Sequence, residues 1–323
     1  MTNFWSKKRV LVTGGLGFIG GHLVEKLIES GAVVSVLDNV SNPSLRKEKI
    51  APQNVTVIRG ECKDETVAEH ACKNIDVVMH LAAKVAGVDY NRQHKGTMLS
   101  ENLLIQTVML EAARRVGVDR FLAVSSAVVY PADAKIPTPE SEGFRGEPEE
   151  ANGGYGWAKR VNELLARYYH DEFGMGVAIV RPYNCYGPGD HFFPTPTHVI
   201  PSLIRRVMDG EDPVVVWGSG RQTRAFLYVE DLVRGMMLAT EKYAVADPIN
   251  LGSDEEVTMK QLIETIIRVS GKTPKIVFDE IKPDGSPRRN SDNRKAKEKL
   301  GFSAETPLEI GLQKTITWLE KSE

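Results

Sequence analysis

The stretch VTGGLGFIG at residues 12–20 decides the fold expected for this chain. It follows the short apolar run 9–13, which is typical of a buried strand, and it opens a segment whose apolar residues recur at helical spacing. Gly14, Gly17 and Gly20 form a Gly-x-x-Gly-x-x-Gly turn. Such a turn lets backbone N–H groups at the start of a helix approach a pyrophosphate. The stretch therefore predicts a dinucleotide-binding turn between the first strand and the first helix.

The same alternation of strand and helix continues along the first half of the chain. Short apolar strands are predicted at 32–37, 55–58, 76–81, 120–125 and 177–181, and helices at 18–30, 64–73, 101–116 and 157–173. Strands that are apolar along their whole length are typical of a parallel sheet covered on both faces. We therefore expect an α/β fold built on a Rossmann-type parallel sheet with helices on both faces.

The alternation breaks after Arg181, where five prolines fall between 182 and 201 and predict a loop-rich but packed region. Shorter elements follow, namely strands at 214–217 and 275–278 and helices at 229–240, 259–270, 294–300 and 308–320. The first expected domain covers residues 1–180, with 220–252 returning to it, and would bind the dinucleotide. The second, a smaller mixed α/β domain, covers 181–219 and 253–323.

Several residues at the ends of strands are expected to complete the cofactor site. Asp38 ends the second strand, where a carboxylate can accept both ribose hydroxyls and repel a 2′-phosphate, so it favours NAD over NADP. Glu61 is placed to meet the adenine, and a solvated strand end is the competing explanation. The predicted cofactor-binding set is Gly14, Gly17, Phe18, Ile19, Gly20, Asp38, Asn39, Glu61, Leu81, Ala82, Ala83, Tyr155 and Lys159.

Tyr155 and Lys159 stand four residues apart, one above the other on a predicted helix face. A nearby cation stabilises a phenolate, so we expect Lys159 to lower the pKa of Tyr155 and to make it a general base near neutral pH. The pair follows a strand that ends in Ser125-Ser126, and ligands of parallel sheets gather at the carboxyl ends of the strands. Together these features predict a catalytic site.

Composition limits the other possible functions. A net charge of −2 gives the chain as a whole no reason to bind nucleic acid or an anionic membrane. The three cysteines have no CxxC spacing, which argues against a disulfide framework and a structural zinc site. No segment reaches the ~18 unbroken apolar residues of a membrane span, and no signal peptide is evident. We therefore expect a soluble, cytoplasmic protein without a metal.

The chain resembles an extended short-chain dehydrogenase/reductase of the nucleotide-sugar epimerase/dehydratase family, from Arg9 to about Trp318. Beyond the glycine turn, the resemblance lies in HLAA at 80–83, SS at 125–126, YGWAK at 155–159, RPYNCYGPGD at 181–190 and WGSGRQTRAFLYVEDL at 217–232. It implies NAD as the cofactor, a nucleoside-diphosphate sugar bound by the smaller domain, and a homodimer that pairs through the helices at 101–116 and 157–173.

The resemblance also implies roles for individual residues. Ser126 would bridge the sugar hydroxyl being oxidised, Tyr155 would move its proton, and Lys159 would hold the nicotinamide ribose. Two further positions, Asn184 and Arg224, would hold the substrate pyrophosphate with help from Arg288 or Arg289, and the planar fork of arginine suits phosphate independently. The implied substrate-binding set is Lys84, Ser126, Asn184, His198, Val199, Arg206, Trp217, Arg224, Arg288 and Arg289.

Three stretches resemble the family members that handle GDP-sugars. HLAAKVAGV at 80–88 and HVIPSLIRR at 198–206 resemble GDP-fucose synthase, and RNSDNRKAKEKLGF at 289–302 resembles GDP-mannose 3,5-epimerase. Both types carry a catalytic cysteine two residues after the position of Ser126. This chain has Val128 there, and an isopropyl group can neither give nor take a proton.

The dehydratases of the family carry an Asp-Glu pair at the positions of Ala127 and Val128, so these two residues exclude dehydration equally. In UDP-galactose 4-epimerase the same positions, which form one wall of the active site, hold small and apolar residues. The expected function is therefore NAD-dependent 4-epimerisation of a UDP- or GDP-hexose by transient oxidation at C4. A GDP-4-keto-6-deoxy-sugar reductase/epimerase of the GDP-fucose synthase type is the first alternative. A non-catalytic dinucleotide-sensing protein is the second, and the presence of both Tyr155 and Lys159 disfavours it.

His198 occupies the second epimerisation position of GDP-fucose synthase, and its ordinary pKa would suit proton transfer. The sequence shows no partner acid for it, so a hydrogen bond to a sugar hydroxyl is expected. A metal held by Asp190, His191 and His198 is not expected, because polar residues near a sugar pocket have simpler uses.

Overall fold

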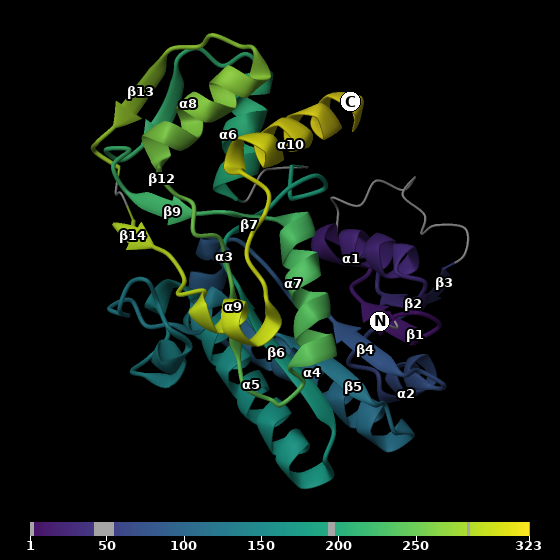
Figure 1. Cartoon of the computed structure of the whole chain (residues 1–323). Helices are drawn as coiled ribbons and strands as arrows, with labels where there is room; N and C mark the ends of the chain where they lie inside the picture. The colour runs from purple at the N-terminus through teal and green to yellow at the C-terminus, as the bar shows by residue number, and fades with distance from the viewer. Residues whose placement is uncertain (1–2, 42–54, 193–197, 283–284, 323) are drawn as a thin grey trace.

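The computed structural model describes residues 3–41, 55–192, 198–282 and 285–322. Its centre is a seven-stranded sheet in the order β3-β2-β1-β4-β5-β6-β11, and every neighbouring pair is parallel (Figure 1). The strands are β1 Arg9–Thr13, β2 Val33–Asp38, β3 Thr56–Arg59, β4 Val77–His80, β5 Arg120–Val124, β6 Gly176–Pro182 and β11 Ile249–Leu251. The expected α/β class is confirmed.

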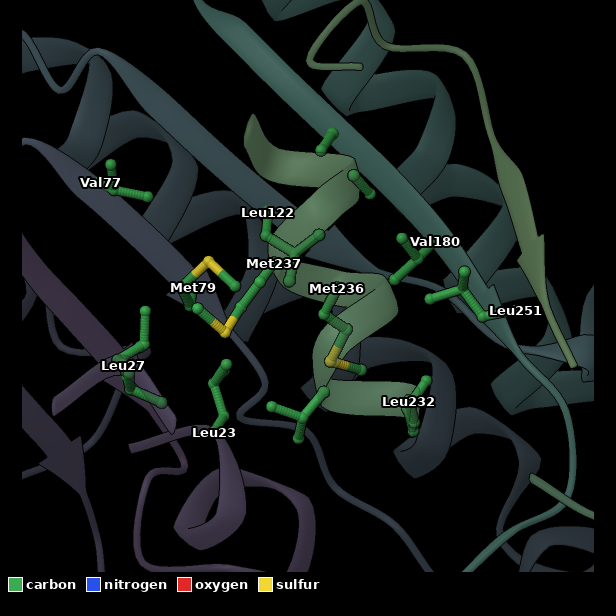
Figure 2. Close-up of a cluster of buried hydrophobic side chains, with 14 of the residues drawn as sticks. Leu23, Leu27, Val77, Met79, Leu122, Val180, Leu232, Met236, Met237 and Leu251 are labelled. Atoms are coloured by element: carbon green, nitrogen blue, oxygen red, sulfur yellow. The ribbon is translucent and has the colours of Figure 1, made fainter. Parts of the chain in front are cut away.

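Helices cover both faces of this sheet because its strands are apolar on both sides. One face packs against α1 (Phe18–Glu29) and α7 (Val229–Lys242), whose side chains meet those of β4, β5 and β6 (Figure 2). The other face packs against α2 (Glu65–Cys72), α4 (Lys95–Val116) and α5 (Gly153–Phe173). The buried sheet thus fixes the carboxyl ends of β1, β2, β4 and β5 along one edge.

A second set of elements forms its own core beyond this edge. The helices are α6 (Val199–Met208), α8 (Met259–Ser270) and α10 (Leu308–Ser322), and they pack around β8 (Val214–Trp217). The small sheets pair β8 with β13 (Ile276–Asp279), β7 (Cys185–Tyr186) with β10 (Leu227–Tyr228), and β9 (Thr223–Ala225) with both β12 (Glu256–Thr258) and β14 (Arg288–Arg289). Helix α9 spans Arg294–Leu300.

The structure differs from the sequence prediction at several helix boundaries. Helix α6 lies inside the stretch expected to be loop-rich; its Pro201 falls in the first turn, where a missing N–H costs no hydrogen bond. Helix α4 begins at Lys95 and α5 at Gly153, earlier than the polar and glycine-rich segments suggested, and a further helix α3 spans Val88–Gln93. None of the helices in the described ranges combines the length and apolar character that crossing a membrane requires.

Candidate active site

The glycine turn at the start of α1 packs closely against the segment that follows β4. Gly14 has φ +67°, and a Cβ there would lie 3.1 Å from the backbone of Ala82 at the end of β4. A Cβ on Gly20 would lie 2.1 Å from the carbonyl oxygen of Gly14, so only glycine permits this close packing. Gly17 caps α1 without a side-chain hydrogen bond, and the first turn of α1 holds no acidic residue. The N–H groups of this turn, those of Phe18 and Ile19 included, therefore face an anion-binding position.

Asp38 lies at the mouth of the same turn. Its carboxylate accepts hydrogen bonds from the N–H of Leu16, at 3.1 Å, and of Val40, at 2.8 Å, and the residue is 8% exposed. Beside it, the amide of Asn39 donates to Glu61 at 3.1 Å. A close-packed glycine turn, an N-terminus of α1 without a side-chain cap and a carboxylate at the end of β2 fit the pyrophosphate and ribose of NAD.

The end of β4 is fixed to β1 by a buried hydrogen-bond chain. The Thr13 hydroxyl lies 2.8 Å from Nδ1 of His80 and accepts from the N–H of Ala82 at 3.1 Å. Burial, together with the charge of Lys159, lowers the pKa of His80 to about 3, so the imidazole is neutral at physiological pH. The chain therefore holds the Leu81-Ala82-Ala83 segment against the glycine turn without adding a charge.

The predicted catalytic residues converge on the carboxyl end of β5. Ser126 caps the short 3₁₀ turn Ala127–Val129, and its hydroxyl accepts from the N–H of Val128 at 3.3 Å. Lys159 donates from Nζ to the carbonyl oxygen of Val124 at 2.6 Å, and its Nζ lies 5.5 Å from the ring centroid of Tyr155. Helix α5 thus presents the tyrosine and the lysine to the strand end that carries the serine.

The protonation states within this group differ from the sequence expectation. Burial raises the pKa of Tyr155, so the expected lowering by Lys159 is wrong for the protein alone. Burial also lowers the pKa of Lys159 to about 8, although the charge of Glu163 opposes the shift. The physical reason is desolvation, which disfavours the charged form of both groups. The site therefore holds a neutral phenol beside an ammonium that loses its proton readily.

The register of β14 against β9 separates the two candidate arginines. The parallel pairing sets Arg289 beside Arg224 and Arg288 beside Thr223, and adjacent strand residues point to opposite faces. Arg288 binds the carboxylate of Glu256 through two bonds of 2.7 and 2.8 Å. Burial and the positive charge of Arg289 lower the pKa of Arg224. Two cations therefore share one face of this small sheet, where an anion would relieve their repulsion.

Neighbouring polar groups hold this cationic pair in place. Glu149, which precedes α5, accepts from Arg289 at 2.7 Å and so links the pair to the large sheet's side of the molecule. Asn184, at φ 31°, donates its amide to the carbonyl oxygen of Ala225 at 2.8 Å, next to Arg224.

A cavity of about 460 Å³ opens at the start of β9, and its lining residues are Ser219, Arg221, Gln222, Glu280 and Pro287.

His198 has a partner acid, contrary to the sequence expectation. Its Nδ1 lies 3.0 Å from Oδ1 of Asp190, and Nδ1 of His191 lies 3.3 Å from the same oxygen. Hydrogen bonding explains this arrangement without an ion, and the absence of a metal stays a prediction. Sequence reasoning missed the pairing although both residues lie in quoted motifs, because their separation of eight residues matches no helix or strand spacing.

The remaining predicted substrate residues lie on different elements of the structure. Val199 opens α6, whereas Arg206 lies near the other end of this helix and binds Glu211. Trp217 ends β8 with 64% of its surface exposed. Lys84 follows β4, and its backbone exchanges hydrogen bonds with the amide of Asn102.

Comparison with known proteins agrees with this geometry. Residues 10–252 match the family described as NAD dependent epimerase/dehydratase. The chain belongs to this family. This membership confirms the expected family and the expected cofactor, NAD.

Similar proteins span the whole chain. It is 35% identical over 320 residues, 97% of each protein, to dTDP-4-dehydro-6-deoxy-D-allose reductase of Streptomyces bikiniensis. It is 33% identical over 326 residues, again 97% of each, to GDP-L-fucose synthase of Escherichia coli K12. The structure of UDP-glucose 4-epimerase from Thermotoga maritima, with UDP-glucose, covers 97% of this chain and 99% of its own, at 31% identity and a TM-score of 0.86. Enzymes named epimerase, reductase and synthase thus share this fold.

Proposed function

We propose that the protein catalyses epimerisation at C4 of a nucleoside-diphosphate hexose and retains NAD through the cycle. The observation that carries this proposal is the 3₁₀ turn that follows β5 and forms one wall of the site. In this wall the Ser126 hydroxyl is followed by Ala127 and Val128. Neither residue can move a proton to or from a ring carbon. The chemistry that this wall permits is confined to a sugar oxygen and its own carbon.

Each side chain then has a separate task. Bound NAD supplies the acceptance and return of hydride at C4. In the oxidation step Tyr155 would accept the 4-hydroxyl proton as a phenolate, which burial disfavours and the adjacent Lys159 cation favours, and in the return step the resulting phenol would donate that proton back. Ser126 shares that proton through its hydroxyl, and Lys159 holds the cofactor ribose. Arg224 and Arg289 bind the substrate pyrophosphate, since paired guanidinium groups suit phosphate oxygens.

Cofactor preference separates this proposal from the second candidate. Asp38 favours NAD, which suits an enzyme that regenerates its cofactor in each cycle. A 4-keto-sugar reductase is the second candidate, and the relative of 35% identity that is named a reductase of a dTDP-4-dehydro-6-deoxy sugar favours it. The same serine, tyrosine and lysine would serve both reactions, which differ in whether reduced cofactor is consumed.

One experiment tests both candidates. The purified protein is incubated with UDP-, GDP- and dTDP-hexoses without added cofactor, and the products are identified by NMR. An epimerase gives a C4 epimer under these conditions. A parallel reaction contains a 4-keto-6-deoxy nucleotide sugar with stoichiometric NADH or NADPH. Turnover in that reaction alone would replace the epimerase by the reductase, and turnover in neither would refute both.

We propose further that the protein is a homodimer that pairs through α4 and α5. These two helices pack against each other in one protomer and also carry large exposed apolar side chains, namely Leu104, Trp157, Val161 and Tyr168. Light scattering on the purified protein tests this proposal. A monomer at micromolar concentration would contradict it.

A further inference from the structure

The contact between Asp190 and His198 joins a buried carboxylate to a half-exposed imidazole. The Asp190 side chain is 1% exposed, whereas that of His198 is 47% exposed. Nδ1 of His198 lies 3.0 Å from Oδ1 of Asp190. Within the described ranges no hydrogen bond reaches Oδ2 of Asp190, so its buried charge is compensated through Oδ1. The bond through Nδ1 leaves Nε2 as the ring nitrogen that can meet a ligand.

The carboxylate counteracts two effects that disfavour a charged imidazole at this position. His198 is the N-cap of α6, where the positive end of the helix dipole repels a cation. Burial also lowers the pKa of His198, but the hydrogen bond and the charge of Asp190 outweigh it and raise the pKa. Among the described residues, His191 contacts both groups, with its ring centroid 5.3 Å from that of His198, and the Cys185 thiol interacts with the charge of Asp190.

The surrounding contacts place this pair between the two parts of the molecule. The carbonyl oxygen of Pro188 lies 2.8 Å from Nε2 of His22 on α1, the helix that the glycine turn opens. A Cβ on Gly189 would lie 3.9 Å from Phe18, in the first turn of the same helix. The segment before Asp190 thus packs on α1 of the large-sheet part, while His198 is the N-cap of α6 in the smaller part.

We propose that Asp190 is a positioning residue, which fixes the ring of His198 and keeps it a charged donor whose Nε2 contacts an oxygen of the bound sugar. This inference rests on the proposed nucleotide-sugar substrate. A charge-assisted bond of this kind is about twice as strong as a neutral one, so it would orient the sugar before the chemistry at C4. The proton stays on the imidazole, because the role is to bind and not to exchange hydrogen at carbon.

The first test needs no substrate. Histidine signals of the cofactor-loaded protein are followed by NMR against pH, with His198 assigned by its loss in His198→Gln. We expect the wild-type midpoint to lie above ~6.5, the ordinary histidine value. In Asp190→Asn it should fall by about one unit or more, a tenfold change in proton affinity, because burial and the helix end remain. His191→Gln is the matched control and should leave the midpoint nearly unchanged, since Asp190 keeps its charge.

A wild-type midpoint below the ordinary value overturns the proposal even if Asp190→Asn does not fold. An unchanged midpoint in a folded Asp190→Asn protein overturns it too. Neither result depends on whether the enzyme is an epimerase or a reductase.

The second test is the pH dependence of KM with whichever nucleotide sugar is turned over. In the wild type, KM should rise as His198 loses its proton, with little change in kcat. Asp190→Asn should move that rise to lower pH by about the NMR shift, and His198→Gln should abolish it. A merely structural role would lower kcat/KM equally at every pH, and that outcome would refute the positioning role.

Discussion

Replacing Arg289 by alanine, with Arg288→Ala as its matched control, tests whether the register of a two-residue strand decides substrate binding. Arg289 shares a face with Arg224, whereas the neighbouring Arg288 turns away to Glu256. Loss of one hydrogen bond to a charged group costs roughly 1.5–3 kcal/mol, which is about 10- to 150-fold in Kd. The Arg288 guanidinium binds Glu256 instead, so its loss should leave the affinity for the diphosphate nearly unchanged.

The assay is isothermal titration of the NAD-loaded protein with UDP, GDP and dTDP. The diphosphates alone are sufficient, because the predicted contact is to the pyrophosphate. Arg224→Ala should lower the diphosphate affinity by about as much as Arg289→Ala. Both variants should contain as much bound NAD after purification as the wild-type protein does. The double variant tests coupling: because the two guanidinium groups share one face and interact with each other and with Glu149, the two losses should not add.

Equal losses in Arg288→Ala and Arg289→Ala would refute the argument from strand register. A loss of NAD with unchanged diphosphate affinity would instead assign the arginine pair to the cofactor.

Three further predictions concern the chemistry. Tyr155→Phe should lower turnover by roughly 10²–10⁴-fold with the fold and NAD content kept, since only a hydroxyl is removed; near-full activity would show that another group moves the proton. The nucleotide released on denaturation should be mainly NAD because of Asp38, and chromatography that finds mainly NADP would contradict this. Turnover in D₂O should leave no deuterium at C3 or C5 of the sugar, because Val128 stands where a cysteine would be needed; deuterium at either carbon, seen by NMR, would require a different acid.

Local pattern sufficed to predict six of the seven strands of the large sheet, with β11 as the exception, and the glycine turn between β1 and α1. The glycine spacing at 14–20 predicts a tight turn in which backbone segments pack closely. The turn between β1 and α1 has this packing, because Gly20 lies against the carbonyl oxygen of Gly14 and leaves no space for a Cβ. Strands that are apolar along their whole length are typical of a buried parallel sheet, and the observed pairs are parallel throughout, but this pattern does not give the order of the strands. The position of Asp38 beside Leu16 follows from this order of strands, since β2 lies next to β1.

Local sequence pattern was insufficient to predict features that depend on contacts between distant segments, namely side-chain pKa shifts, hydrogen-bond partners and the face on which a side chain lies. The lowered pKa predicted for Tyr155 considered only the lysine one turn away, whereas burial by the surrounding elements dominates. The partner of His198 is eight residues away along the chain, so no helical or strand spacing points to it. The choice between Arg288 and Arg289 depends on pairing with β9, and a two-residue strand has no periodicity that predicts its face.

The distribution of charge divides binding from chemistry in this site. On the inner side, burial favours the uncharged forms of Tyr155, Lys159 and His80. On the outer side, Arg224 and Arg289 place fixed positive charge where a pyrophosphate can neutralise it. Transfer of a proton or a hydride requires less reorganisation of the surroundings in a site that contains few mobile charges and little water. We therefore expect the arginine face to supply most of the substrate affinity, so mutations there should change KM, whereas mutations on the inner wall should change kcat.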